Sequence, residues 1–429
     1  MIIEPTRSVK IIQGDSLKVL RTLKDKSVHC VMTSPPYWGL RDYQVDGQLG
    51  SEETFDQFVA RMVEWAQEVK RVLHPSGTLW INFGDSYNSS MTRGTYGDQS
   101  KHGYEPHGVK RTRIKTMSPK NLIGQPWRIA FALQEMGFIL RSDIIWHKPN
   151  PMPSSVRDRP TSSHEYLFLF SKRNRYFYDQ DAIRDPLKNV EDNKRQLLYQ
   201  QRKRAERTTE EKPDDVHHSV SEAFKASEET VQQALIRGAN KRTVWTIPTE
   251  AFPDAHYATF PRALVEPVIL AGTSEAGCCP VCLSPLVRDR IASDLFTEHG
   301  GERKRADAPG AEVSPTSVFR TGKIRVYAQG DWRPTCRHEF DQPIPCTVLD
   351  PFSGSGTTGV VANNLGRNYV GIELSPESVQ MSLDRIFKNS KTPLFTNFER
   401  IVYEEEEILS GENVEEIEEC GIDCQTADC

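Results

Sequence analysis

Short apolar segments alternate with amphipathic segments along most of the chain, and this alternation constrains the possible folds more than any other feature. The strand-like segments of the first ninety residues lie at 9–15, 28–33 and 77–87, and helical spacing of apolar residues occurs at 16–23 and 52–73. The same alternation returns in residues 122–172, 261–272 and 346–387. Strands that alternate with helices form a parallel sheet covered by helices on both faces. The sequence therefore predicts an α/β doubly wound, Rossmann-like sheet.

Two polar stretches interrupt this pattern. Residues 88–120 are rich in Gly, Ser, Tyr, His, Lys and Arg, and residues 182–240 are strongly polar and charged. Neither stretch has the apolar periodicity of a buried helix or strand. We expect both to be insertions in one α/β domain.

Composition narrows the class of protein further. The chain has 429 residues, 37% of them hydrophobic, and it contains no apolar run long enough for a membrane span and no signal-peptide pattern. Residues 399–429 carry a net charge of −11, which leaves the rest of the chain at +6. A basic body is compatible with a nucleic-acid partner, and the acidic terminus is expected to be a solvated tail. The cytoplasm is the expected compartment, with no membrane partner.

The segment "VMTSPPYWGLRDY", which begins at Val31, ends a strand in an unusual way. Proline cannot donate to a sheet ladder, so the strand must stop at Thr33. The next four residues are Ser34, Pro35, Pro36 and Tyr37, a rigid elbow that carries one hydroxyl and one aromatic ring. Glycine or asparagine would be more favourable in an ordinary turn.

A second special turn follows a strand more than three hundred residues later, in "VLDPFSGSGTTGVVANNLGRNYVGIELSPE". The strand ends at Asp350, and the turn contains Phe352, Gly354 and Gly356 before a helix begins. Such a turn allows the backbone to approach a ligand at a helix N-terminus. Glu373 ends the next strand, where doubly wound sheets place an acid that binds ribose hydroxyls.

Together, the two turns resemble the motifs of the DNA amino-methyltransferases. "FSGSG" is similar to the family's S-adenosylmethionine loop, and "SPPY" is similar to its catalytic tetrapeptide. The catalytic motif precedes the cofactor motif here, which resembles the circularly permuted class β. Serine in the first position of "TSPPY" resembles the cytosine-N4-specific subgroup. The resemblance extends from Val9 to about Phe387, without the polar insertions.

The resemblance implies a mechanism for the elbow. The exocyclic amine of cytosine is a poor nucleophile, and the Ser34 hydroxyl and the Pro35 carbonyl would accept its hydrogens so that its lone pair faces the methyl group. Pro35 and Pro36 would hold these acceptors in place. Tyr37, with Trp38 as a further candidate, would stack on a base rotated out of the duplex.

The resemblance also implies a pocket for S-adenosylmethionine. Asp15 in "QGDSL" would contact the adenine, and Phe260 and Pro261 in "HYATFPRALVEPVILAGT" would flank the methionine moiety. A helix cap at Asp15 and core packing at Phe260 are the alternative roles. The other implied cofactor residues are Asp350, Phe352, Gly354, Gly356, Thr357 and Glu373.

Two close pairs of soft ligands indicate a metal site. Cys279 and Cys282 form a Cys-x-x-Cys pair, and Cys336 and His338 form a second pair 53 residues later. Two such pairs suit tetrahedral Zn²⁺, and a structural metal would anchor the ends of the polar segment between them. Cys278 is an alternative to Cys279, and four unrelated reduced side chains are the alternative to a metal.

Basic residues in the first insertion are the candidates for contacts with double-stranded DNA. They are Lys110, Arg111, Arg113 and Lys115. Such residues contact phosphates and position a duplex without recognising its sequence. A solvated charged surface is the alternative.

The predicted division of the chain follows from these assignments. It comprises a catalytic half at 1–181 with the basic insertion 88–120, a target-recognition segment at 182–240, a cofactor half at 241–274 and 346–390, a zinc-binding insertion at 275–345 and an acidic tail at 391–429.

Several functions remain open at this point. The expected activity is methylation of cytosine N4 in DNA, with a restriction nuclease as a candidate partner; alternatives are adenine-N6 methylation, an RNA or protein substrate, and a catalytically silent DNA-binding relative. Carbon-5 cytosine methylation is excluded, because its Pro-Cys and Glu-Asn-Val fragments occur here out of context. Pro345-Cys346 precedes the glycine turn, and Glu412 to Val414 lie in the acidic tail.

Overall fold

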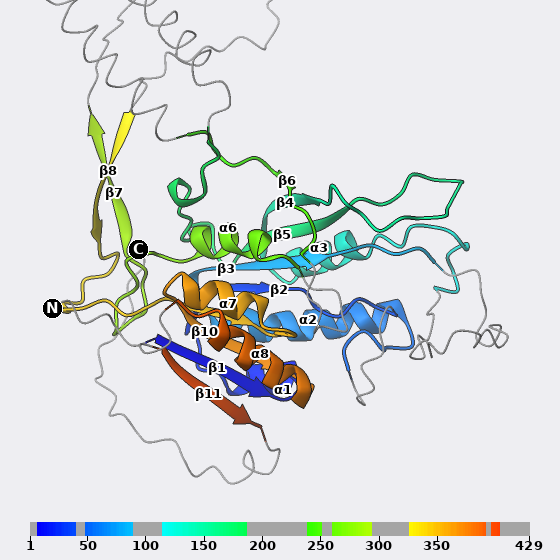
Figure 1. Ribbon diagram of the computed structural model, residues 1–429, viewed down its shortest axis with the longest axis horizontal. Coiled ribbons are helices and arrows are strands. Elements are labelled where there is room, and N and C mark those ends of the chain that lie inside the picture. The colour runs from blue at the N-terminus through cyan, green and yellow to red at the C-terminus, as the bar shows by residue number, and fades with distance from the viewer. Residues whose placement is uncertain are drawn as a thin grey trace, which may run out of the picture.

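A nine-stranded sheet forms the centre of the protein (Figure 1). The computed structural model describes residues 7–39, 48–88, 114–186, 238–250, 260–293, 326–391 and 396–403. The strands lie in the order β11 (Thr396–Val402), β1 (Arg7–Gln13), β10 (Asn368–Glu373), β9 (Thr347–Asp350), β2 (Val28–Thr33), β3 (Leu73–Phe83), β5 (His164–Ser171), β4 (Ile139–His147) and β6 (Val244–Thr246).

The sheet is mostly parallel, which confirms the predicted α/β class. Neighbouring strands from β11 to β3 run parallel, as do β4 and β6. Strand β5 is the exception, because it pairs antiparallel with both β3 and β4. Its sequence, HEYLFLFS, is buried over its second half and gives no signal of strand direction.

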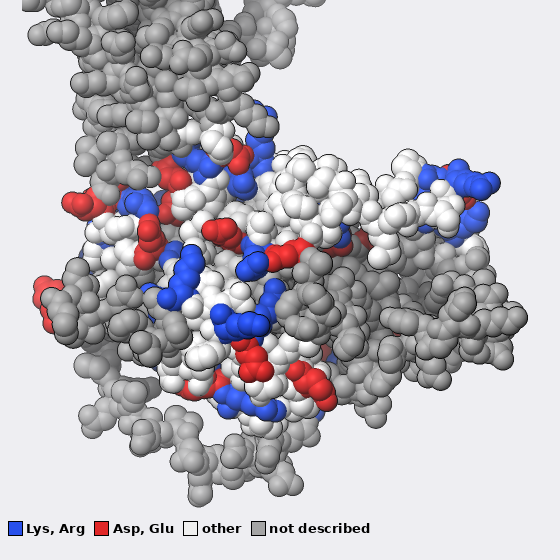
Figure 2. Space-filling view, in the orientation of Figure 1, with Lys and Arg blue, Asp and Glu red and all other residues white. Residues whose placement is uncertain are grey.

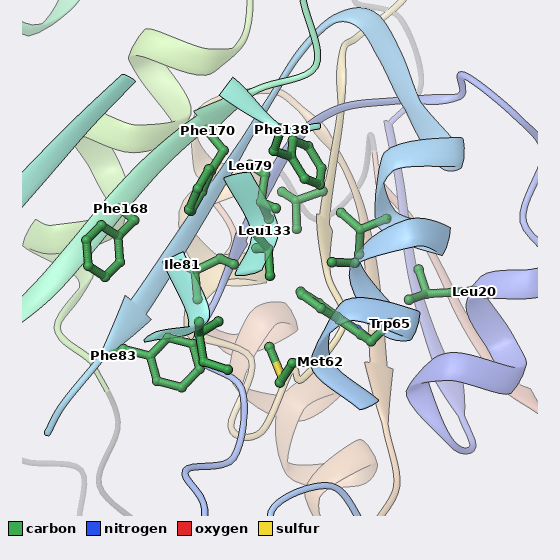
Figure 3. Close-up of a cluster of buried hydrophobic side chains, with 14 of the residues drawn as sticks. Leu20, Met62, Trp65, Leu79, Ile81, Phe83, Leu133, Phe138, Phe168 and Phe170 are labelled. Atoms are coloured by element: carbon green, nitrogen blue, oxygen red, sulfur yellow. The ribbon is translucent and has the colours of Figure 1, made fainter. Parts of the chain in front are cut away.

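Helices cover both faces of this sheet. On one face lie α1 (Ser16–Thr22), α2 (Phe55–Val72) and α3 (Gln125–Glu135), and on the other lie α6 (Arg262–Gly272), α7 (Thr357–Asn364) and α8 (Pro376–Lys388). The 3₁₀ turn η1 (Asp181–Ile183) packs beside α6. Figure 3 shows the core beneath α2, in which Met62 and Trp65 belong to one cluster with Leu79 and Leu133.

Polar residues define where the helices begin. Thr54 and Gln57 form a reciprocal capping box before α2, with backbone N–H to side-chain oxygen distances of 3.2 and 3.1 Å. Ser375 caps α8, and its hydroxyl accepts a hydrogen bond from the Ser378 N–H at 3.3 Å.

Strand β2 is buried along its whole length, between the two cores. Val31 faces the core of α1, α2 and α3, whereas Cys30 and Met32 face the core of α6, α7 and α8. This alternation follows from the two-residue period of a strand. A strand covered on both faces belongs at the centre of a sheet, and β2 lies there.

The direction of the chain reverses between β9 and β2. From β9 the chain proceeds to β10 and then β11, while from β2 it proceeds the opposite way to β3. Doubly wound sheets bind ligands outside the carboxyl ends of the strands at such a switch point. Both special turns follow strands that meet there.

Two further features complete the fold. The hairpin of β7 (Val287–Ser293) and β8 (Val326–Arg333) forms a separate sheet that projects away from the central one (Figure 1). In the described part of the chain, no helix combines the length and apolar character needed to cross a membrane.

Part of the predicted acidic tail is a strand of the central sheet. Residues 396–402, inside the predicted tail 391–429, form strand β11, which pairs parallel with β1 over its whole length. The prediction was wrong here because the acids that follow Tyr403 dominate the local composition. Most of the two polar insertions and residues 404–429 lie outside the described residues.

Candidate active site

The two motif strands are joined by a buried hydrogen bond. Strands β2 and β9 pair through Cys30–Val348 and Val31–Leu349, so the elbow and the glycine turn begin beside each other. At the carboxyl end of this joint, the Thr33 hydroxyl donates to Asp350 Oδ1 at 2.7 Å. The two segments therefore meet at neighbouring strand ends, as one site built from both motifs requires.

Asp350 is the centre of this joint and is fully buried. The Thr358 hydroxyl donates to its second oxygen at 2.7 Å, and the Phe352 N–H donates to Oδ1 at 3.1 Å. Burial raises the pKa of Asp350 to about 6, and these hydrogen bonds oppose the increase. Asp350 therefore organises the glycine turn from inside the protein.

The elbow carries a chain of hydrogen bonds. The Ser34 hydroxyl donates to Tyr37 Oη at 3.4 Å, and the Tyr37 hydroxyl donates to Glu165 Oε2 at 3.2 Å. The Tyr37 ring stacks on Phe83, with 5.3 Å between ring centroids. Burial, followed by the charge of Glu165, raises the pKa of Tyr37 well above its ordinary value, so the phenol keeps its proton.

Glu165 is a site residue that the sequence did not reveal. It lies at the start of β5, and its carboxylate forms an ion pair with Lys148, whose ammonium also lies 4.3 Å from the Trp146 ring centroid. Gly84 makes room for this arrangement, because a Cβ there would lie 3.0 Å from Tyr37 Cε2 and 3.4 Å from the Glu165 carboxyl carbon.

Trp38 does not face the site. Its side chain is 2% exposed, its indole N–H donates to the Glu52 carbonyl at 3.0 Å, and its ring contacts Phe55 edge-on. Its proposed stacking on a substrate base was wrong, because the chain turns into the core directly after Tyr37.

The glycine turn is held in place from two sides. Gly354, at φ +51°, donates its N–H to Glu373 Oε2 at 2.8 Å, and the Ser375 N–H donates to Oε1 of the same carboxylate at 2.9 Å. Gly356, at φ +74°, is the N-cap of α7, and a Cβ there would lie 2.3 Å from Ser382 Oγ. A Cβ at Gly354 would meet no atom closer than 4.0 Å, so its surroundings are open.

Arg385 supports the same turn and was also missed from the sequence. From α8 its guanidinium donates to the Ser355 carbonyl at 3.2 Å, to Ser355 Oγ at 2.7 Å and to Thr357 Oγ1 at 2.9 Å. Its position in an amphipathic helix gave no signal of this contact.

The remaining predicted cofactor residues, Asp15, Phe260 and Pro261, lie at the starts of helices α1 and α6. Asp15 follows β1, whose Gln13 pairs with Glu373, and its carboxylate caps α1 by accepting from the Lys18 N–H at 3.0 Å. Pro261 is the N-cap of α6, and Phe260 packs partly buried against the core of α6, α7 and α8. The helix-cap and core-packing roles are thus both present.

The four predicted metal ligands come together, although they come from distant parts of the chain. The ligand atoms of Cys279, Cys282, Cys336 and His338 all lie within 4.8 Å of one another, and Cys279 Sγ lies 3.8 Å from His338 Nδ1. Around a tetrahedral Zn²⁺, bond lengths of about 2.3 Å to sulfur and 2.0 Å to nitrogen separate ligand atoms by roughly 3.5–3.8 Å. The donor set and its spacing fit Zn²⁺.

The predicted basic stripe is mostly outside the described residues. Lys110, Arg111 and Arg113 lie there, and Lys115 is exposed at the start of a described segment. Cys346, from the excluded Pro-Cys fragment, is buried just before the amino end of β9. The elbow follows the opposite, carboxyl end of the neighbouring strand β2.

Comparison with known sequences identifies similar proteins over most of the chain. A family described as DNA methylase, of the N6 and N4 methyltransferases, matches residues 28–286 and 346–384. The type II methyltransferase M.Cfr9I of Citrobacter freundii is 37% identical over 376 residues, 88% of this chain and 87% of that protein. The type II methyltransferase M.SmaI of Serratia marcescens is 34% identical, over 89% of this chain and 92% of that protein.

Comparison with solved structures finds more distant similarity. The PvuII DNA methyltransferase, described as cytosine-N4-specific, is 16% identical with a TM-score of 0.47, over 92% of this chain and 98% of that one. The putative DNA modification methylase TTHA0409 of Thermus thermophilus, solved with S-adenosyl-L-methionine, is 19% identical with a TM-score of 0.45, over 92% and 99%.

Proposed function

The chain belongs to the DNA methylase family, and on this premise we propose that it transfers a methyl group from S-adenosyl-L-methionine to the N4 amine of cytosine in DNA. The observation that carries the proposal is the Thr33–Asp350 hydrogen bond, which places the elbow and the glycine turn at one switch point. The order of these two motifs in the chain supports assignment to the permuted class β.

The glycine turn and its neighbours would hold the methyl donor, which supplies an electrophilic methyl group on a sulfonium when bound. The open surroundings of Gly354 allow a ligand to approach the backbone. Glu373 uses one lone pair of each carboxylate oxygen on the backbone, which leaves acceptor capacity for ribose hydroxyls. Asp15 and Phe260 with Pro261 are proposed to contact the adenine and methionine ends.

The hydrogen-bond chain at the elbow would orient Ser34 toward the amine. Because Ser34 donates to Tyr37 and Tyr37 donates to Glu165, the Ser34 oxygen keeps its lone pairs for the hydrogens of N4. Glu165 is paired as a carboxylate with the Lys148 ammonium, and an ionised carboxylate can only accept. Glu165 is thus a positioning residue that fixes the direction of the whole chain.

The Pro35 carbonyl is proposed as the second acceptor, and the proline pair restricts its movement. Tyr37 would contact the rotated base with its ring. No covalent intermediate is needed, because the amine nitrogen attacks the methyl group directly. Holding amine and methyl in line lowers the barrier by up to about 7–11 kcal/mol.

A basic loop beside the site is a candidate surface for DNA. The connection between β4 and β5, residues 148–163, projects from the domain in Figure 1, and Figure 2 shows Lys and Arg side chains at that projection. Arg157 is exposed there, and Arg159 lies 3.6 Å from the Tyr87 ring centroid. These cations would contact phosphates together with the predicted stripe at 110–115. A restriction nuclease with the same target is the proposed biological partner.

Cys279, Cys282, Cys336 and His338 are proposed to bind one structural Zn²⁺. Support comes from the donor set and the mutual distances within 4.8 Å. Four protein ligands complete a tetrahedral site and leave no open position for hydrolytic chemistry.

Adenine N6 is the second candidate target, because the same acceptors can orient either exocyclic amine. The serine at the first motif position favours cytosine. The test is to express the chain in a host that lacks DNA methylation and to sequence that DNA by a method that detects modified bases directly, with Ser34→Ala as the control. Marks on cytosine N4 at one sequence are expected from the unaltered chain only. Marks on adenine alone would overturn the base assignment, and no marks despite donor binding would favour a silent DNA-binding protein.

A further inference from the structure

The proposed metal ligands lie near the amino ends of the central strands, whereas the elbow follows the carboxyl end of β2. Cys279 and Cys282 belong to a tight turn in which the Cys279 N–H donates to the Ser284 carbonyl at 3.0 Å and the Leu283 N–H donates to the Cys279 carbonyl at 2.9 Å. Leu283 has φ +61°, which is strained for a branched side chain. A metal bound to both cysteines would stabilise this turn.

His29 connects this turn to both motif strands. It lies in β2, is 3% exposed, and accepts a hydrogen bond on Nδ1 from the Thr347 N–H at 3.0 Å. Its Nε2 lies 2.8 Å from the Leu283 carbonyl, which can only accept, so the proton is on Nε2. One imidazole therefore links β2, the first residue of β9 and the residue after Cys282.

A second histidine reinforces the link from β3. His74 stacks on His29 with ring centroids 5.8 Å apart, and its Nδ1 accepts a hydrogen bond from the Ser76 N–H at 3.2 Å. The base of the insertion is also tied to the chain before β9, because Cys278 and Ile344 exchange backbone hydrogen bonds of 2.8 and 3.0 Å.

We propose that the metal held by Cys279, Cys282, Cys336 and His338 clamps the amino ends of β2 and β9 through His29. These strands share only two register pairs, so their alignment depends on side chains at each end of the joint. Thr33 and Asp350 provide the tie at the carboxyl end, and His29 provides the tie at the amino end. The clamp would keep the elbow and the glycine turn aligned without taking part in chemistry.

The neighbouring group of His29, Cys278 and Cys346 is not a second metal site. Its three ligand atoms also lie within 4.8 Å of one another. Both ring nitrogens of His29 are already occupied by backbone groups, however, so no lone pair remains for a metal. This difference supplies a matched control, because Cys278 lies next to a ligand and is not one.

The metal itself is tested by the zinc content of the purified full chain. We expect one Zn²⁺ per chain in the unaltered protein and in Cys278→Ala, and at least a tenfold weaker affinity in His338→Gln, whose side chain is exposed. Absence of zinc from the unaltered protein would overturn the proposal, as would an affinity in His338→Gln equal to that of the unaltered protein. Loss of zinc in Cys278→Ala alone would overturn the ligand set.

The clamp is tested by hydrogen–deuterium exchange, whose outcome does not depend on methyl transfer. In His29→Phe a somewhat larger aromatic ring takes this position and is expected to keep the stack on His74, but both hydrogen bonds are lost. We expect zinc to remain bound while the amides of 28–31 and 347–349 exchange at least tenfold faster, and those of β4 and β5 are unchanged. Removal of zinc from the unaltered protein by a chelator should accelerate the same segments. Unchanged exchange in both segments after either treatment, or equal acceleration across the whole sheet, would overturn the clamp.

Discussion

Substitution of Thr33 by valine removes the hydrogen bond that joins the two motif strands. Valine has nearly the same shape, so the change leaves no cavity, and both Thr33 and Asp350 are 0% exposed. A hydrogen bond to a charged acceptor contributes about 1.5–3 kcal/mol. With an oxygen–oxygen distance of 2.7 Å and a fully buried carboxylate, we expect Thr33→Val to lower the free energy of unfolding by about 2–3 kcal/mol at pH 8.

This cost should depend on pH, because the pKa of Asp350 in the folded protein is raised to about 6 from 3.8. The folded state therefore binds more protons between these values, and the contribution of Asp350 to stability falls as pH rises through this range. The Thr33 hydroxyl donates to the ionised form of Asp350, so its removal raises the pKa of Asp350 further. The resulting loss in the free energy of unfolding is largest at pH values above this pKa. At pH 5 the remaining bond is between neutral groups, worth about 0.5–1.5 kcal/mol.

Urea unfolding at pH 5 and pH 8 measures the loss in the free energy of unfolding that Thr33→Val causes at each pH. Thr33→Ser is the control, because it keeps the hydroxyl. We expect the cost of Thr33→Val to be larger at pH 8 and the cost of Thr33→Ser to show little pH dependence. A cost below about 0.5 kcal/mol at pH 8, or an equal cost at both values, would refute the role assigned to this bond.

Four other substitutions test the site. Gly356→Ala should lower the free energy of unfolding, measured by urea unfolding, by about 2–5 kcal/mol, because of strain at φ +74° and overlap with Ser382. Gly354→Ala should lower it by only about 1–2 kcal/mol and should mainly weaken donor binding. Glu165→Gln should lower the single-turnover rate of methyl transfer by about 10–100-fold with unchanged donor affinity by calorimetry; a larger effect on affinity than on rate would contradict its positioning role. Arg385→Met should weaken donor binding about tenfold by calorimetry, because the glycine turn loses three hydrogen bonds; unchanged affinity would show that the turn holds its shape alone.

The sequence was sufficient to predict the order of most elements and the meeting of the two turns. Strand β2 was predicted to its last residue because proline must end it, and a serine such as Ser375 is a common first residue before a helix. These are local signals. The pairing of β2 with β9 is not local, and the resemblance of both turns to one family was the signal that they belong to one site.

The antiparallel direction of β5 and the strand β11 could not be predicted by the same reasoning. A short buried apolar run has no feature that depends on its direction in the sheet. Residues 396–402 pair only because β1, almost four hundred residues earlier, offers an edge.

Site residues that act through tertiary contacts were missed for a related reason. Glu165 reaches Tyr37 only because β5 pairs with β3, where Phe83 lies opposite Tyr166. Arg385 reaches the glycine turn across the face of α8. The proposed metal ligands were easier to find, because the Cys-x-x-Cys and Cys-x-His spacings are visible in the chain itself.

The most direct test of the proposed activity is nucleoside mass spectrometry of unmethylated DNA incubated with the purified chain and a donor that carries a deuterated methyl group. The proposal predicts deuterated N4-methylcytosine, formed by the unaltered chain and not by Ser34→Ala. Deuterated N6-methyladenine alone would contradict the target, and a label on cytosine that survives in Ser34→Ala would contradict the role of the elbow.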